Sequence, residues 1–266
     1  MRIDAFLVQE GYVGGREKAK ELLAAGYVTV DGRPVTKPSA RVTDGQQVVC
    51  SAPAPRYVGR GGYKLEKALS VTATDLTGLT CMDVGASTGG FTDCMLQQGA
   101  AHVYAVDVGH DQLHPCLRED PRVTVLEGTD VRSERLRAAV PEGSVGFACV
   151  DVSFVSLRHV LPSVLPYMGA ESTLTCLIKP QFEAGKSGIG KHGVVKDRKV
   201  HVRVLEQQLL LFQELSLSVK CFTFSPITGG EGNVEYLAVL GCYTTDPGVS
   251  VDPTAVVAEA FAALKR

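Results

Sequence analysis

The lysine at position 179 stands at the end of an almost uncharged run, residues 172–178, and is followed by Pro180. An ammonium group removed from water is destabilised relative to the neutral amine, and a neutral amine can accept a proton. Lys179 is therefore a candidate for proton transfer, provided that other residues are placed to hold it. The alternative is a lysine that extends its charged end to water from the end of a strand.

A second candidate is the glycine-rich segment at residues 83–91, which reads DVGASTGGF. Its three glycines allow a tight turn and let a ligand approach the start of a following helix. A GxGxxG dinucleotide fingerprint would need glycine at position 87, which is serine, although NAD stays an alternative ligand. The opening acid instead resembles the first motif of S-adenosylmethionine-dependent enzymes, which implies that the acid and nearby amides receive the amino-acid end of that cofactor. The residues expected to bind it are Asp83, Gly85, Ala86, Ser87, Thr88, Gly89, Gly90 and Phe91.

Three further acids follow predicted strands. Asp107 lies about 20 residues beyond the glycine loop, where a carboxylate can accept both hydrogen bonds of a ribose diol in NAD or in S-adenosylmethionine, and Val108 completes this part of the expected site. Asp130 resembles the methyltransferase position that contacts adenine, and it could equally cap the helix that follows. Asp151 follows a strand next to the one that ends at Lys179. We therefore expect Asp151 near both the cofactor and Lys179.

From residue 79 onward, short apolar strands alternate with helical segments, which is typical of an α/β fold with a parallel sheet. The clearest helix covers residues 198–215, whose apolar residues recur on one side. A glycine-rich turn at residues 227–232 predicts that the last two strands form an antiparallel hairpin at one edge. The fold class is thus α/β, with a Rossmann-like, seven-stranded domain of the methyltransferase kind. The predicted strands are residues 80–84, 102–107, 123–126, 146–150, 173–178, 219–224 and 235–242.

The first 50 residues predict a small, separate α+β unit. Apolar spacing indicates one short helix that includes Ile3 and Leu7 and a second over residues 16–25, which Gly26 ends. Two β segments about an Asp-Gly turn at residues 28–35 and a third at 48–50 complete the unit. Pro53 and Pro55 then stiffen a linker. The predicted division is 1–52 for the N-terminal domain, 53–61 for the linker, 62–245 for the methyltransferase-like domain and 246–266 for a C-terminal tail with a short helix.

Positive charge gathers at the N-terminal end. Residues 1–64 carry ten Lys and Arg against six Asp and Glu, a net charge of +4, although the whole chain carries −2. A second basic stretch, residues 179–203, has seven Lys and Arg against two acids. Both stretches favour a polyanionic partner, although a solvated surface would give the same counts.

The N-terminal motifs resemble the S4 RNA-binding domain. They are R-x-D-x-x-L at residues 2–7, R-x-x-A-x-x-L at 16–22, G-x-V-x-V-D-G at 26–32 and K-P at 37–38. The resemblance implies that the second helix and its loop face RNA phosphates, which position the nucleic acid without reading its bases. The expected RNA-binding residues are Arg2, Arg16, Lys18, Lys20 and, beside the linker, Arg60.

Two more residues complete a set with Asp151 and Lys179, namely Lys64 in the sequence RGGYKL and Glu235 in GNVEY. In this order, Lys–Asp–Lys–Glu resembles the catalytic tetrad of FtsJ-like RNA ribose 2′-O-methyltransferases. With an S4-like unit in front, the chain resembles the TlyA family of haemolysin A-like rRNA cytidine-2′-O-methyltransferases over nearly its full length. The resemblance implies S-adenosyl-L-methionine as cofactor and ribosomal RNA or a ribosomal subunit as partner. In this interpretation Lys179 is the base, Asp151 orients it, and Lys64 and Glu235 hold the lysine array and the ribose.

The composition of the chain limits the classes of protein to which it can belong. The eight cysteines form no CxxC pair and predict reduced core residues and a cytoplasmic protein. No apolar run approaches the roughly 18 residues of a membrane helix, so we expect no membrane partner, and we predict no metal site. Two alternative functions stay open, a non-catalytic S4-type RNA-binding or ribosome-assembly factor and a membrane-lytic haemolysin. The sequence leaves the oligomeric state open.

Overall fold

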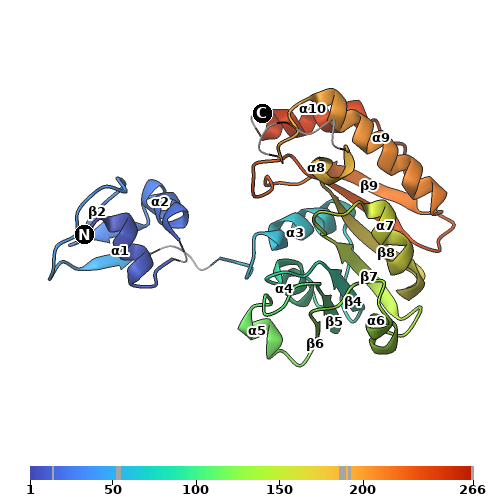
Figure 1. The fold of residues 1–266 in the computed structure, drawn as a ribbon, viewed down its shortest axis with the longest axis horizontal. Helices are drawn as coiled ribbons and strands as arrows, with labels where there is room; N and C mark the ends of the chain where they lie inside the picture. Colours follow the sequence, from blue (N-terminus) through green and yellow to red (C-terminus); the bar gives the residue numbers. More distant parts are fainter. Residues whose placement is uncertain (14, 52–54, 186–189, 191–192, 265–266) are drawn as a thin grey trace. The chain divides into compact units, whose positions relative to one another are not determined.

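The chain folds into two compact units, Met1–Arg56 and Tyr57–Arg266, in a computed structural model (Figure 1). The structure describes residues 1–13, 15–51, 55–185, 190 and 193–264. Most of the predicted linker core, residues 52–54, lies outside the described residues, as do the basic residues Lys186 and Lys191.

The N-terminal unit contains two helices and a three-stranded antiparallel sheet, as its sequence predicts. Its apolar core includes Ile3 and Leu7 from the first helix and Leu23 from the second. The residues of the Asp31-Gly32 turn have φ angles of 52° and 73°, which suit a tight hairpin between two strands. The sheet order is β2-β1-β3. The elements are α1 (Ile3–Gln9), α2 (Arg16–Ala24), β1 (Val28–Val30), β2 (Arg33–Pro34) and β3 (Val48–Cys50).

A seven-stranded sheet forms the centre of the second unit. Its order is β6-β5-β4-β7-β8-β10-β9, and the first five strands in this order run parallel. The last two strands along the chain pair antiparallel, which confirms the predicted edge hairpin, and β10 inserts between β8 and β9. The strands are β4 (Thr80–Val84), β5 (His102–Val106), β6 (Val123–Leu126), β7 (Val145–Val150), β8 (Met168–Ile178), β9 (Ser218–Phe224) and β10 (Tyr236–Gly241).

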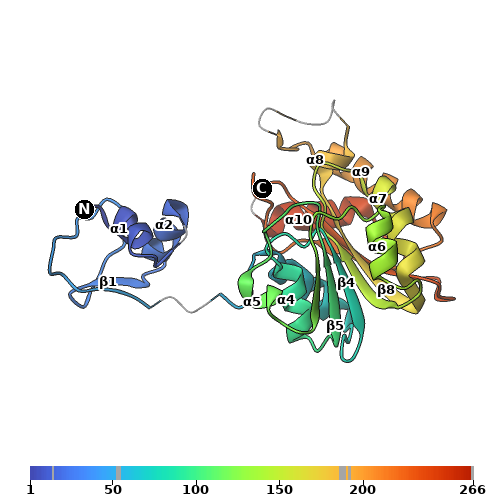
Figure 2. The ribbon, with the colours of Figure 1, turned by 60° about the horizontal axis from the view of Figure 1, so that its bottom comes forward.

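Helices cover both faces of this sheet (Figures 1 and 2). Side chains of α3 and α4 pack on one face, and those of α6, α7, α9 and α10 pack in the larger core on the other. The C-terminal α10 contributes Val257, Ala260 and Phe261 to that larger core. The helices are α3 (Gly61–Thr72), α4 (Gly90–Gln97), α5 (Pro115–Arg118), α6 (Glu134–Ala139), α7 (Leu157–Val164), η1 (Leu165–Tyr167), α8 (Pro180–Glu183), α9 (Arg198–Glu214) and α10 (Pro253–Ala263).

The strand register brings four chain segments to one edge of the sheet. Val150, the last residue of β7, pairs with Val84 at the end of β4 on one side and with Cys176 near the end of β8 on the other. Because β10 is antiparallel, its first residue, Tyr236, pairs with Ile178. The order of strands reverses between β4 and β7, and open α/β sheets bind ligands at such a point. The residues that follow these strand ends are therefore forced together.

The burial of α9 provides a stability test with a matched pair of leucines. Leu211 is 3% exposed and belongs to the larger core, whereas its neighbour Leu210 is 58% exposed. We expect Leu211→Ala to lower the free energy of unfolding by about 2–5 kcal/mol, because it removes buried methyl groups and leaves a cavity. Leu210→Ala should change it by less than about 0.5 kcal/mol. Urea unfolding measures both variants, and equal losses would contradict the assigned helix register.

Candidate active site

Two lysines and two carboxylates meet where the strand ends converge. Lys64 Nζ on α3 lies 2.7 Å from Glu235 Oε2 and 4.0 Å from Asp151 Oδ2, and Lys179 Nζ lies 2.6 Å from Asp151 Oδ1. Lys64, Lys179 and Glu235 are 8%, 9% and 2% exposed. Lys179 therefore does not extend its charged end to open water. The structure brings together all four residues of the tetrad that the sequence suggested.

Lys179 has a second close partner, because its Nζ donates a hydrogen bond to Ser153 Oγ at 2.9 Å. The contact with Asp151 is an ion pair without hydrogen-bond geometry, since Asp151 Oδ1 has no hydrogen-bond partner among the described residues. Ser153 was not among the residues predicted from the sequence. Its place two residues after Asp151, beyond the same strand end, is the signal that could have identified it.

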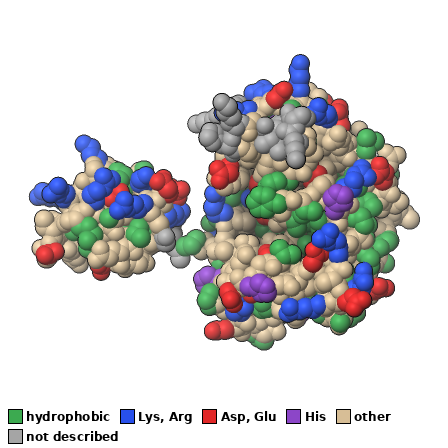
Figure 3. All heavy atoms as spheres, viewed as in Figure 1, with side chains coloured by type: hydrophobic (Ala, Val, Ile, Leu, Met, Phe, Trp, Pro, Cys, Tyr) green, Lys and Arg blue, Asp and Glu red, His purple; other side chains and the backbone are tan. Residues whose placement is uncertain are grey.

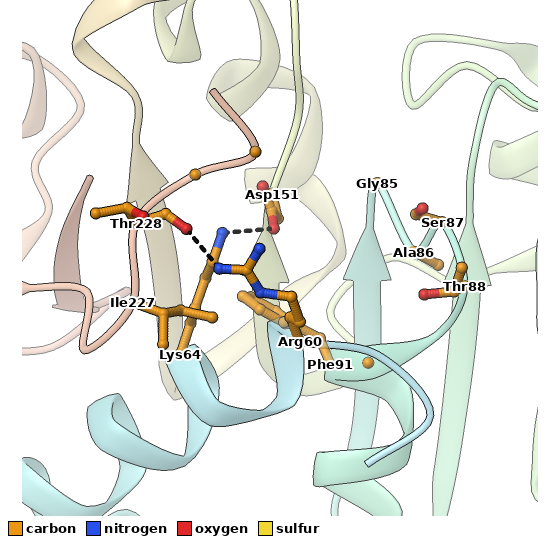
Figure 4. A pocket seen from close by; sticks show the side chains of 14 residues that line it. Arg60, Lys64, Gly85, Ala86, Ser87, Thr88, Phe91, Asp151, Ile227 and Thr228 are labelled. Carbon is orange, nitrogen blue, oxygen red and sulfur yellow. Dashed lines mark hydrogen bonds and ion pairs between the residues drawn. The ribbon is translucent and has the colours of Figure 1, made fainter. Parts of the chain in front are cut away.

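Two cavities adjoin the tetrad and share Gly85, Ser87 and Asp151 in their linings. The larger, of about 510 Å³, lies beyond β4, β5 and β7 and is lined by Asp107, Asp130 and several valines, including Val108. The smaller, of about 190 Å³, lies between the glycine loop, the first turn of α3 and the loop at residues 227–230 (Figure 4). Of the predicted loop residues, the smaller cavity is lined by Gly85, Ala86, Ser87, Thr88, Gly90 and Phe91.

The glycine at position 85 is required by its surroundings. It has a φ of 88°, and a Cβ at this position would overlap the backbone carbonyl oxygen of Asp151. The glycine thus lets the loop after β4 pass close to the loop after β7. The next turn is held by Asp107, whose Oδ2 accepts the N–H of Ser87 at 2.8 Å and whose Oδ1 accepts that of Gly109 at 2.7 Å. These bonds orient the Asp107 carboxylate and leave it further lone pairs for a ligand.

The acid at position 130 does not cap the helix that follows it. Ser133 caps α6, because its Oγ accepts the N–H of Leu136 at 3.3 Å, so that alternative for Asp130 is wrong. Asp130 instead lines the larger cavity and accepts a bidentate contact from the Arg132 guanidinium at 2.6 and 2.8 Å. This guanidinium lowers the pKa of Asp130 to about 2, so the carboxylate is ionised and accepts hydrogen bonds at neutral pH.

The acid that opens the glycine motif is fully buried. Asp83 Oδ2 accepts the hydroxyl of Thr92 at 2.7 Å, and its Oδ1 lies 3.4 Å from Cys149 Sγ. Among the described residues that line the two cavities, Asp83 is absent, and so is Gly89. Burial raises the pKa of Asp83 to about 6, although both hydrogen bonds oppose the rise. In this structure the Asp83 side chain therefore links β4 to α4 and β7, whereas the sequence motif predicts that it contacts the cofactor.

A further acid, Glu127, organises the wall of the larger cavity and was not anticipated from the sequence. Its carboxylate accepts the backbone N–H groups of residues 111–113 at 2.8–2.9 Å and the Arg118 guanidinium at 2.6 Å. Burial opposes ionisation, but Arg118 and the three amides lower the pKa of Glu127 to about 2. The bonds hold the loop that carries Gln112 into the cavity lining. Glu127 lies just after β6, which is the position that could have drawn attention to it.

The predicted RNA-binding residues occupy two settings. Arg60 is exposed, lines the smaller cavity and donates to the carbonyl oxygen of Thr228 at 3.0 Å (Figure 4). The other four belong to the N-terminal unit, where Figure 3 shows several Lys and Arg side chains on the visible face. Three of these four form ion pairs within the unit, and Arg16 has no ion-pair partner among the described residues. The pairs are Arg2–Asp4 at 2.9 Å, Lys18–Glu21 at 3.0 Å and Lys20–Glu17 at 2.5 Å.

Comparison with known proteins identifies both units. Residues 57–242 match the family of FtsJ-like methyltransferases, and residues 1–48 match the S4 domain. The 16S/23S rRNA (cytidine-2′-O)-methyltransferase TlyA of Mycobacterium tuberculosis is 42% identical over 91% of this chain and 90% of its own length. A Bacillus subtilis protein described as a candidate rRNA methyltransferase, YqxC, is 43% identical over 89% of this chain and 84% of its own length.

The fold is also similar to a solved structure from Streptococcus thermophilus that is described as a candidate hemolysin. It has a TM-score of 0.77 and 41% sequence identity, and the match covers 100% of this chain and 97% of that one. The second unit thus has a methyltransferase fold with a charged site at its ligand-binding edge. The chain belongs to the FtsJ-like methyltransferase family. Within the described residues, no helix combines the length and the hydrophobicity needed to cross a membrane.

The buried Asp83 carboxyl predicts a distinctive pH dependence of stability. Its pKa is raised from 3.8 to about 6, so between these values the folded chain binds more protons than the unfolded chain. Stability contributed by protonated Asp83 is present below about pH 4 and is lost as the pH rises to about 6. Relative to Asp83→Asn, the free energy of unfolding of the natural protein should fall by about 3 kcal/mol across this window.

Chemical denaturation of both proteins at a series of pH values measures this difference. The altered hydrogen bonding of the asparagine adds an offset that does not vary with pH, and the other titrating groups cancel. A difference that stays level from pH 4 to pH 8 would contradict the assigned environment of Asp83.

Proposed function

We propose that this chain transfers a methyl group from S-adenosyl-L-methionine to the ribose 2′-hydroxyl of a cytidine in ribosomal RNA. The observation that carries the proposal is the nearly buried tetrad of Lys64, Asp151, Lys179 and Glu235 at the ligand-binding edge of a methyltransferase fold. The names of the relatives from M. tuberculosis and B. subtilis support the RNA substrate. The proposed partner is the rRNA of a ribosomal subunit, and the proposed location is the cytoplasm.

The two cavities suit the shape and chemistry of the cofactor. An adenosine would occupy the larger one, with Asp107 accepting the ribose hydroxyls and the ionised Asp130 accepting the adenine amine. The amino-acid end would occupy the smaller one, where the loop at residues 85–91 leads into the N-terminus of α4. Asp83 would support this loop from below without touching the cofactor, since its carboxylate is buried and accepts the hydroxyl of Thr92. When bound, the cofactor supplies an electrophilic methyl group.

The tetrad would activate the ribose hydroxyl. A ribose hydroxyl is a weak nucleophile until its proton is removed or shared, and the reacting oxygen must be held in line with the bond that breaks. We assign to Lys179 the removal of the hydroxyl proton. Asp151 orients Lys179, whose Nζ lies 2.6 Å from Asp151 Oδ1. The ion pair of Lys64 with Glu235 would keep the second ammonium group compensated and fix the floor of the site. These groups need no metal ion to carry out the roles assigned to them.

The N-terminal unit would capture the RNA by its phosphates. The Lys18 and Lys20 pairs with glutamates are solvent-exposed, and such pairs contribute little, so phosphates can replace the glutamates. Of the four predicted residues in this unit, Arg16 is the one that no described carboxylate pairs with, so it is available to a phosphate. Arg2 is held in a bidentate contact with the buried Asp4, which fixes its direction. Arg60, at the mouth of the smaller cavity, would meet RNA close to the reacting ribose.

The role of Lys179 is tested by Lys179→Ala. The variant should still bind S-adenosylhomocysteine, because the side chain lines neither cavity, but should lose methyl transfer by at least about 100-fold, the scale of a missing acid or base group. Calorimetry and incorporation of radiolabelled methyl groups into rRNA measure the two properties. Lys220→Ala is the control, since Lys220 lies on β9 near the opposite end of the sheet. Turnover of the Lys179 variant at the natural rate would overturn the assignment.

The role of the N-terminal unit is tested by Arg16→Gln. The affinity for an rRNA fragment should fall, and the slope of log affinity against log salt should become shallower by about one, the value for one lost phosphate contact. The affinity for S-adenosylhomocysteine should not change. Glu17→Gln provides the comparison on the same helix, because it removes a carboxylate that competes with phosphate for Lys20 and should leave the affinity equal or higher. An unchanged salt slope for Arg16→Gln would place the RNA elsewhere.

A further inference from the structure

The hydroxyl of Ser153 is the second group that holds the proposed base. Lys179 Nζ donates to Ser153 Oγ at 2.9 Å and lies 2.6 Å from Asp151 Oδ1. Both partners lie on the loop that follows β7, so this one loop contacts the ammonium group at two points. Ser153 also lines the larger cavity, which places its hydroxyl beside the proposed cofactor site.

The hydrogen bond to Ser153 determines how the nitrogen of Lys179 is turned. An ammonium or amine nitrogen is tetrahedral, and the ion pair with Asp151, which lacks hydrogen-bond geometry, would leave it free to rotate about its bond to the side chain. The hydrogen bond to Ser153 stops this rotation and sets the directions of the remaining positions on the nitrogen. The base is then prepared before substrate binds, and such preparation lowers the barrier to reaction.

The loop that carries Ser153 is held at both ends. At its start, the N–H of Asp151 donates to the carbonyl oxygen of Val84 at 2.9 Å. At its end, the Glu183 carboxylate accepts the hydroxyl of Ser156 at 2.7 Å and the N–H of Leu157 at 2.9 Å. The residue after Ser153, Phe154, has a φ of 66°, an unusual conformation for a residue other than glycine, and its ring contacts that of Phe182 with the centroids 4.9 Å apart. Ser153 is therefore presented from a fixed backbone.

We propose that Ser153 is a positioning residue for methyl transfer, which orients Lys179 so that a free position on its nitrogen faces the ribose hydroxyl. The inference rests on the proposed function and extends it to a residue outside the tetrad. The hydroxyl accepts from Lys179, and its own proton stays available for a donor bond into the larger cavity. Ser153 itself is exposed, and when its hydroxyl is removed Lys179 keeps the ion pair with Asp151, so the fold should tolerate the truncation.

The test compares Ser153→Ala, Ser153→Thr and the control Ser156→Ala. Ser156 lies on the same loop and caps α7, but its hydroxyl contacts Glu183, so its removal tests the loop without touching Lys179. We expect Ser153→Ala to lower kcat about tenfold, with unchanged KM for rRNA and unchanged affinity for S-adenosylhomocysteine. Ser153→Thr keeps the hydroxyl and should restore kcat to within about threefold of the natural value. Ser156→Ala should lower the melting temperature and keep kcat.

Natural kcat in Ser153→Ala would overturn the proposal. An equal loss of kcat in Ser156→Ala would also overturn it, as would a parallel loss of cofactor affinity in Ser153→Ala or a failure of Ser153→Thr to restore kcat.

A second measurement does not depend on turnover. It is the rate at which Lys179 is reductively methylated, measured by mass spectrometry with Lys64 as the internal reference. Lys179 should react faster in Ser153→Ala than in the natural protein. If the natural protein transfers no methyl group to rRNA, the proposed function fails, and equal reaction rates of Lys179 would separately show that the contact is absent.

Discussion

The site depends on four charged side chains that neutralise one another where they are largely shielded from water. Two ammonium groups and two carboxylates sum to zero formal charge, and Lys64, Lys179 and Glu235 are each less than a tenth exposed. Removing any one of them leaves an uncompensated charge, which is far more costly than the intact set. The four residues come from α3 and from the ends of β7, β8 and β10. The sheet register, more than any local sequence, must therefore be maintained for the charges to meet.

Most of the sheet could be predicted from sequence because buried parallel strands are continuous apolar runs. The predicted bounds of the strands at 80–84 and 123–126 match β4 and β6, and the edge hairpin was recognised from its glycine-rich turn. The first five residues of β8 were not predicted, because this stretch contains glycine and the exposed Glu171 and resembles a loop. Its strand conformation follows from pairing with β7, which a reading of local composition does not include.

Within the site, the sequence predicts which residues lie at the strand ends better than it predicts which partners their side chains contact. Asp151 and Lys179 could be paired in advance because the ends of neighbouring parallel strands converge. The partners of Asp83 could not, because strand alternation alone does not say whether an acid faces a cavity or a helix, and here it meets Thr92 of α4. The predicted cap of the helix that follows Asp130 was wrong by three residues. Asp130 and Ser133 are both polar residues that could cap this helix, and only the path of the backbone decides between them.

The neutral tetrad has a consequence for how RNA is bound. Because its formal charges cancel, it contributes little long-range attraction for phosphates, so attraction must come from other cations. The excess is present at the N-terminal end, where residues 1–63, which end before Lys64 of the tetrad, carry nine Lys and Arg against six Asp and Glu, a net charge of +3. These nine cations are exposed and screened by salt, whereas the buried ion pairs are screened much less. Capture of RNA and activation of the ribose therefore rest on two sets of charges that respond differently to the solution, and each can vary without disturbing the other.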